Sequence, residues 1–135
     1  MIRPLAAASF CGLLLAACSQ GGVKADANDP YAGLDKQILA WHTDLEANHP
    51  ACRTKVDGHG CESFEVRCKA MQEITPDEKA KGITAQVIAA MTFSGRSEDG
   101  STGKAGSAFA LFSKAGGQWT RAEAMPVKLD TCAPL

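Results

Sequence analysis

The first seventeen residues constrain this chain most, because they decide where the rest of it folds and under which redox conditions. Arg3 precedes an apolar run from Leu5 to Ala17. A positive residue followed by an apolar run of this length is typical of a secretory signal, and the run is too short to span a membrane. We therefore expect residues 18–135 to fold outside the cytoplasm, where cysteines form disulfides.

The end of this leader reads Leu15-Ala16-Ala17-Cys18. It resembles the lipobox of bacterial lipoprotein precursors, in which a branched apolar residue and two small residues precede a cysteine. The resemblance implies cleavage before Cys18, acylation of its sulfur and often of its new amino group. Cys11 follows the bulky Phe10 and does not match. The alternative is an ordinary secretory signal with an A-x-A-like cleavage site.

Lipidation would anchor the protein at Cys18. A single chain of about fourteen carbons binds a membrane reversibly, whereas two or three chains give a stable anchor. Ser19 follows the cysteine where enteric bacteria use Asp as an inner-membrane retention signal, so the analogy favours the outer membrane with the domain facing the periplasm. The small and polar residues 18–28 indicate a flexible tether.

Size and charge restrict what the remaining residues 29–135 can bind. They are enough for one small domain with a single core. The full chain has 14 basic and 15 acidic side chains, and the loss of Arg3 with the leader leaves a net charge near −2. This balance gives no electrostatic reason to expect nucleic acid as a partner. The sequence contains no second apolar run of spanning length, so we expect membrane contact only through the acyl chains on Cys18.

Four cysteines follow the tether, and three pairings among them are possible. We favour a Cys52–Cys61 disulfide, which closes a small loop, and a Cys68–Cys132 disulfide, which ties the C-terminal tail to the first strand. The alternative is a zinc site made by Cys52, His59, Cys61 and Cys68. This set lacks the tight C-x2-C spacing, and structural zinc thiolates belong mainly to reducing compartments.

The sequence predicts one amphipathic helix over residues 29–48. Asp29 is suited to cap it and Pro30 to occupy its first position, while Pro50 disfavours helical geometry at His49 and so ends it. Apolar residues at spacings of three and four form one stripe, which we expect to face the core. The stripe consists of Tyr31, Leu34, Ile38, Trp41 and Leu45.

Two segments predict strands. Residues 62–70 alternate, which places Phe64, Val66, Cys68 and Ala70 on one inner face. Residues 83–93 also alternate, and although their alanines suit a helix as well, Ile, Val, Thr and Phe at the other positions favour a strand. Between the two strands, residues 75–78 predict a short capped helical turn.

The C-terminal third predicts a hairpin. Residues 94–107 are polar and glycine-rich, so we expect a mobile loop and the first candidate for partner binding. Residues 108–113 are apolar on both faces, as in an interior strand, and residues 115–118 predict a tight turn to a strand over 119–125. The predicted fold is α+β, with one N-terminal helix packed on an antiparallel meander of about four strands and stapled by disulfides.

Catalytic and cofactor motifs are weak. His42 and Glu46 are one helical turn apart, but such a pair on an outer helix face is usually solvated. Gly103-Lys104 does not form a phosphate loop, because Glu98 and Ala105 occupy the places of its glycine and its Ser or Thr. We therefore expect no catalytic residue, no metal and no cofactor.

A final segment, residues 109–125, resembles the C-terminal hairpin of cystatin-like cone folds, a group that includes ketosteroid isomerase and many binding-only domains. This resemblance implies an alternative function, a cone domain that binds or hydrolyses a small molecule. We favour a non-enzymatic binding or inhibitor-like domain with an envelope protein or a cell-wall component as its partner. A deep apolar pocket with convergent polar groups would favour the cone enzyme, and a filled core would favour the binding domain.

Overall fold

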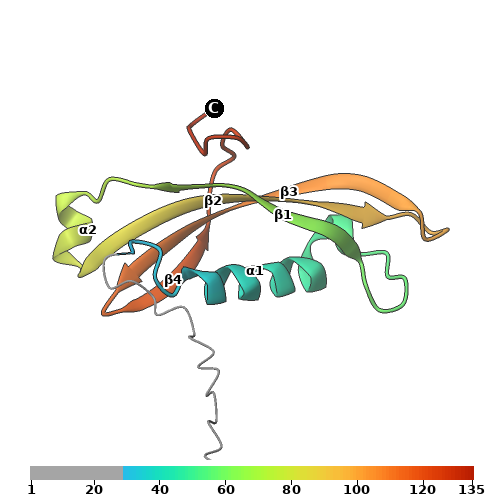
Figure 1. The fold of residues 1–135 in the computed structure, drawn as a ribbon, viewed down its shortest axis with the longest axis horizontal. Helices are drawn as coiled ribbons and strands as arrows, with labels where there is room; N and C mark the ends of the chain where they lie inside the picture. Colours follow the sequence, from blue (N-terminus) through green and yellow to red (C-terminus); the bar gives the residue numbers. More distant parts are fainter. Residues whose placement is uncertain (1–28) are drawn as a thin grey trace, which may run out of the picture.

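The computed structural model describes residues 29–135 and has an α+β architecture, with one main helix lying across a four-stranded antiparallel sheet (Figure 1). The strands follow one another in chain order, so the sheet is a meander, as the sequence predicts. The predicted signal and tether, including Cys18, lie outside the described residues. The elements are α1 (Leu34–Asn48), η1 (Pro50–Cys52), β1 (Cys61–Met71), α2 (Pro76–Ala80), β2 (Ile83–Arg96), β3 (Thr102–Ala115) and β4 (Gln118–Glu123).

Helix α1 begins later than predicted, at Leu34 instead of Pro30. Asp29 caps a turn that precedes the helix, and Gly33, with a φ of 81°, separates this turn from α1. The indole Nε1–H of Trp119 donates to the carbonyl oxygen of Ala32 at 2.8 Å. This contact with β4 holds the turn against the sheet. The local sequence of residues 29–34 does not predict the contact, because its partner Trp119 is distant in the chain.

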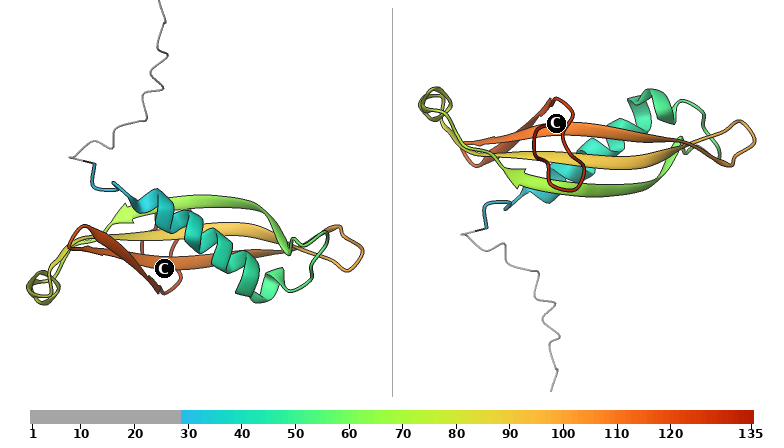
Figure 2. Two further views of the ribbon diagram at one scale, coloured as in Figure 1. Left: turned by 90° about the horizontal axis from the view of Figure 1, so that it is seen from below. Right: turned by 90° about the horizontal axis from the view of Figure 1, so that it is seen from above.

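The apolar stripe of α1 faces the sheet, as predicted. Leu34, Trp41 and Leu45 are buried. Trp41 meets Phe112 of β3 edge to face, with ring centroids 5.8 Å apart. The helix ends at Asn48, where Pro50 was expected to end it. Figure 2 shows that α1 crosses the sheet diagonally, so that its C-terminal half lies on the β3 and β4 side.

Strand β2 is the centre of the core. Its residues alternate between the two sides of the sheet, and the side facing α1 is packed with buried apolar groups. Both neighbouring strands pair with β2 along most of its length, which explains why the alanine-rich segment is a strand and not a helix. The buried α1-facing side chains of β2 are Ala85, Val87, Ala89, Met91 and Phe93.

The prediction that Phe64, Val66, Cys68 and Ala70 share one face is wrong. Phe64 and Val66 pack against the α1 side of the sheet, but Cys68 and Ala70 belong to the apolar cluster on the opposite side. Val66 pairs with Met91 and Cys68 with Ala90, so β1 has one extra residue, Arg67, between two positions whose partners in β2 are consecutive. This β-bulge changes the side on which the following residues lie.

The side of the sheet opposite α1 is covered by the C-terminal segment. A disulfide joins Cys68 to Cys132, and Val127 and Leu129 pack with them on this side. The second disulfide, Cys52–Cys61, closes the loop between η1 and β1. These are the two pairings favoured from the sequence.

The prediction of a mobile loop over residues 94–107 is wrong, because β2 and β3 pair through most of it and leave only residues 97–101 as the turn. Two glycines that suggested flexibility instead permit close packing. A Cβ on Gly95 would lie 2.3 Å from the carbonyl oxygen of Ala51, and one on Gly106 would lie 2.4 Å from the ring of Phe93. Only glycine fits such approaches.

The short helix α2 has the predicted cap. Thr75 Oγ1 accepts the backbone N–H of Glu78, while the Thr75 N–H donates to Glu78 Oε2 at 2.8 Å. This backbone hydrogen bond is the main reason that the pKa of Glu78 lies below its ordinary value. The buried Gln86 donates to Glu78 Oε1, which ties α2 to β2.

Candidate functional site

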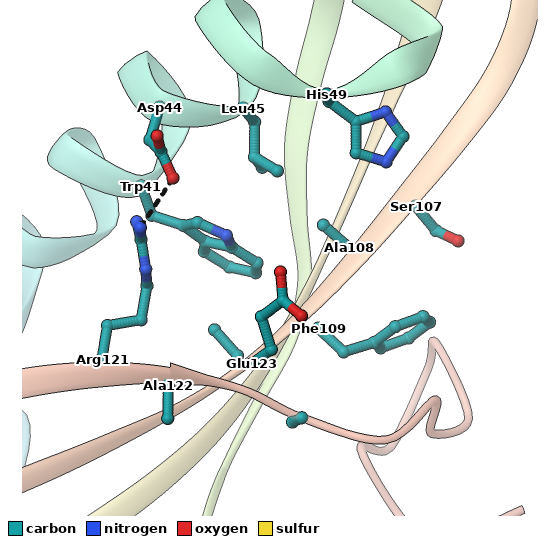
Figure 3. A pocket seen from close by; sticks show the side chains of 12 residues that line it. Trp41, Asp44, Leu45, His49, Ser107, Ala108, Phe109, Arg121, Ala122 and Glu123 are labelled. Atoms are coloured by element: carbon teal, nitrogen blue, oxygen red, sulfur yellow. Dashed lines mark hydrogen bonds and ion pairs between the residues drawn. The ribbon is translucent and has the colours of Figure 1, made fainter.

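A cleft opens between the C-terminal half of α1 and the strands β3 and β4 (Figure 3). We call it the α1–β4 cleft. Its volume is about 240 Å³, and the indole of Trp41 lines it together with several charged or polar side chains. Its lining includes Trp41, Asp44, Leu45, His49, Ser107, Ala108, Phe109, Arg121 and Glu123.

One ion pair closes the cleft on the α1 side. Arg121 Nη2 lies 2.7 Å from Asp44 Oδ2, and the two residues are 77 positions apart in the chain. Trp119, Arg121 and Glu123 alternate along β4, so they share the side of the strand that faces α1. In a strand that faces only the core, the residues after Trp119 on the same side would also be apolar. The charges of Arg121 and Glu123 on that side therefore indicate a polar cleft, a signal that was not used in predicting the site from the sequence.

Two further groups point into this cleft. The carboxylate of Glu123 is directed toward its centre in Figure 3. His49 closes the far end, where its Nδ1 accepts the Ala51 N–H at 3.1 Å and its ring packs against Phe93 at 4.8 Å between centroids. His49 therefore has a structural role at the helix terminus, in agreement with its expected position there.

A second cleft, of about 470 Å³, continues from His49 along the start of β3. We call it the Arg96 cleft. Arg96 Nη2 pairs with Glu62 Oε2 at 3.2 Å, while Arg96 Nε is buried without a hydrogen-bond partner in the described part of the chain. Lys104 also lines this cleft and takes part in none of the ion pairs of residues 29–135. The Arg96 cleft therefore carries excess positive charge.

The other two histidines, His42 on α1 and His59 in the loop before β1, both contact Glu46 outside the α1–β4 cleft. His42 Nε2 is 4.0 Å from Glu46 Oε2, and His59 Nδ1 is 2.9 Å from Glu46 Oε1. The sequence suggested only the first contact, and the loop closed by the Cys52–Cys61 disulfide brings the second. His59 is mostly exposed. Glu46 can orient either ring, but both contacts lie at the surface.

The alternative zinc ligands do not converge. Cys52 and Cys61 are joined to each other, and Cys68 lies on the opposite side of the sheet, bonded to Cys132. Among residues 29–135, no group of three or more His, Cys, Asp or Glu side chains has the geometry to hold a metal ion. Gly103 and Lys104, considered above as a phosphate loop, belong to β3.

Comparisons with protein families, with curated proteins and with solved structures found no match. Within the described residues, α1 and α2 are both too short and too polar to cross a membrane.

Proposed function

We propose that this chain is a lipoprotein of the bacterial cell envelope, anchored through Cys18, whose domain binds another envelope component without catalysing a reaction. The leader and its lipobox-like junction support the anchor. The filled core supports a binding domain: Trp41, Met91 and Phe112 occupy the space between α1 and the sheet, where a cone enzyme would have its deep pocket. Beside this filled interior, the α1–β4 cleft and the Arg96 cleft are open along β3.

The anchor is tested by cell fractionation. We expect the wild-type protein in the membrane fraction with acyl chains on Cys18, and we expect Cys18→Ala to be soluble and to lack the acyl mass. A wild-type protein without acyl mass would contradict the lipoprotein proposal and support ordinary secretion.

Binding is tested with cross-linked, detergent-solubilised envelopes. We expect partners that co-purify with the wild-type protein to be lost with Glu123→Lys, which reverses a charge inside the α1–β4 cleft. Glu73→Lys is a matched control, since it makes the same change at an exposed site outside both clefts. Equal recovery with both variants would exclude this cleft as the binding site.

The alternative function, binding or hydrolysis of a small molecule, is supported by the polar groups that line the α1–β4 cleft. Acid–base chemistry outside this cleft would use His42 and His59, because both contact Glu46 and neither lines the cleft. We expect the combined change to Gln at both histidines to leave the biological role intact. A loss of function in a folded double variant would favour an enzyme, since removal of a general acid or base typically costs about 10²-fold or more in rate.

A further inference from the structure

Strand β3 has a free edge beside both clefts. It pairs with β2 from Thr102 to Ala115, but with β4 only from Ala110 to Ala115. The last contact on the β4 side is the Ala124 N–H donating to the carbonyl oxygen of Phe109 at 3.1 Å. Backbone groups alternate in direction along a strand, so Ser107 and Ala105, two and four residues before Phe109, also direct their N–H and C=O groups to the open side.

The chain itself leaves this edge open. Pro126 follows β4 closely and has no N–H to continue the ladder, and the Cys68–Cys132 disulfide holds the tail on the other side of the sheet. The Cys68–Cys132 disulfide therefore keeps the residues after β4 away from the β3 edge, where a longer β4 would pair.

The other edge of the sheet, β1, has the usual protection against pairing. It contains two register irregularities and four charged side chains, Glu62, Glu65, Arg67 and Lys69. The free part of β3 reads Thr-Gly-Lys-Ala-Gly-Ser-Ala over residues 102–108, with small side chains and one charge. Small residues leave room for an added strand and its side chains.

On these grounds, and resting on the proposed function, we propose that the partner supplies an extended peptide segment that adds to the β3 edge as a fifth strand beneath the C-terminal half of α1. Strand addition of this kind obtains affinity from main-chain hydrogen bonds and specificity from pockets for alternate side chains. Here the two clefts that meet at His49 are the pockets.

The charges of the clefts define the segment. Lys104 and Arg96, balanced only by Glu62, favour an acidic side chain at one end, and Glu123 favours a basic side chain at the other. Lys104 lies six positions before Ala110, the pairing partner of Glu123, so the two charges of the segment should be separated by roughly four to six residues.

A single segment fits this site better than a second copy of the chain. Helix α1 crosses the sheet toward the β3 side, so its C-terminal end stands over the free edge (Figure 2). Two copies joined edge to edge would bring two such helix ends together at the symmetry axis. The two Lys104 side chains would also come close to each other in a ladder centred on Ala105.

The test uses the full-length lipoprotein in detergent micelles and a displayed library of random dodecapeptides. We expect enriched peptides to be rich in Val, Ile and Thr, with an acidic residue near one end and a basic residue near the other. A synthetic copy of one enriched peptide should bind Ser107→Pro at least about tenfold more weakly than wild type, because proline removes an outward N–H. The control is Met71→Pro on the outer edge of β1, which should bind normally.

Two measurements keep the test independent of folding defects. Amide hydrogen exchange of Ala105 and Ser107 in the wild-type protein should slow when the peptide binds. The combined variant Lys104→Glu with Glu123→Lys should select peptides with the order of charges reversed.

Three results would overturn the inference. Peptides that bind Ser107→Pro as well as wild type would exclude the edge but leave the binding-domain proposal standing. A dimer of the wild-type protein that Ser107→Pro dissociates would identify a second copy as the occupant. If no peptide is enriched over empty micelles, the inference that the partner supplies an extended peptide segment is rejected. The envelope cross-linking with Glu123→Lys would then still test the proposed binding function.

Discussion

Gly95 and Gly106 each occupy a place in the sheet where no side chain fits. Gly95 lies against the carbonyl group of Ala51, just before Cys52, so it lets the disulfide-closed loop approach β2. Gly106 lies under the ring of Phe93, which packs in turn on Phe64 at 5.1 Å between centroids. At these positions glycine provides space, and no positive φ is required of it.

We therefore expect Gly95→Ala to destabilise the domain by about 1–3 kcal/mol, the usual cost of overpacking a core position. The new methyl group would meet backbone atoms, which cannot move aside as a flexible side chain can. Urea unfolding measures the change in the free energy of unfolding. Ser97→Ala, in the exposed turn, serves as the control and should have little effect; an equally stable Gly95→Ala would show that the loop can shift freely.

At the scale of elements, the bulge in β1 decides which side of the sheet Cys68 occupies. Val66 pairs with Met91 and Cys68 with the adjacent residue Ala90, so Arg67 is the extra residue. Without the bulge, regular alternation would place Cys68 on the α1 side, far from the C-terminal segment. The Cys68–Cys132 disulfide is compatible with the sheet because of this irregularity.

Deletion of Arg67 should be tolerated. It would convert the bulge into a regular pairing while leaving Val66 opposite Met91 and Cys68 opposite Ala90, so the Cys68–Cys132 disulfide should still form. Mass mapping of non-reduced peptides and thermal melting followed by circular dichroism measure this.

Deletion of Ala89 is the matched control. Ala89 is paired regularly on both sides, with Lys69 and with Ala110, so its loss would exchange the two sides of half of β2 and should prevent folding. A free Cys68 thiol after deletion of Arg67 would contradict the assignment of the bulge.

At the scale of the whole molecule, the two disulfides connect different layers. Cys52–Cys61 closes a loop with a sequence separation of 9 at the end of α1. Cys68–Cys132, with a separation of 64, joins the first strand to the last segment of the chain and holds that segment on the side of the sheet opposite α1. Most of the sheet therefore lies in the chain segment between Cys68 and Cys132.

The disulfide with the longer loop should contribute more stability. In the chain-entropy description, closing the long loop by Cys68–Cys132 stabilises the fold by about 4 kcal/mol, and closing the short loop by Cys52–Cys61 stabilises it by about 3 kcal/mol. We expect Cys68→Ser with Cys132→Ser to lower the free energy of unfolding by roughly 1–2 kcal/mol more than Cys52→Ser with Cys61→Ser. Denaturant unfolding of both double variants measures this, and a larger loss for the short loop would contradict the prediction.

Local sequence patterns determined several parts of this protein. The periodicity of α1, the proline that ends it, the cap of α2 and the glycine pair in the β3–β4 turn all act within a few residues, so they can be read directly. The meander was predicted from the chain order of the strand segments, and the structure has that order. The two favoured disulfides, chosen among three possible pairings, are those of the structure.

Other features were decided only by tertiary contacts. The start of α1 depends on a hydrogen bond from Trp119 to Ala32, and the strands that replace the expected loop depend on pairing partners that local composition does not reveal. The α1–β4 cleft depends on Asp44 and Arg121, which only the folded chain brings together. Local sequence patterns indicate which secondary structure a residue prefers. The side of the sheet on which the residue lies, and the residue it contacts, depend on segments distant in sequence, because burial and strand pairing involve two or more elements.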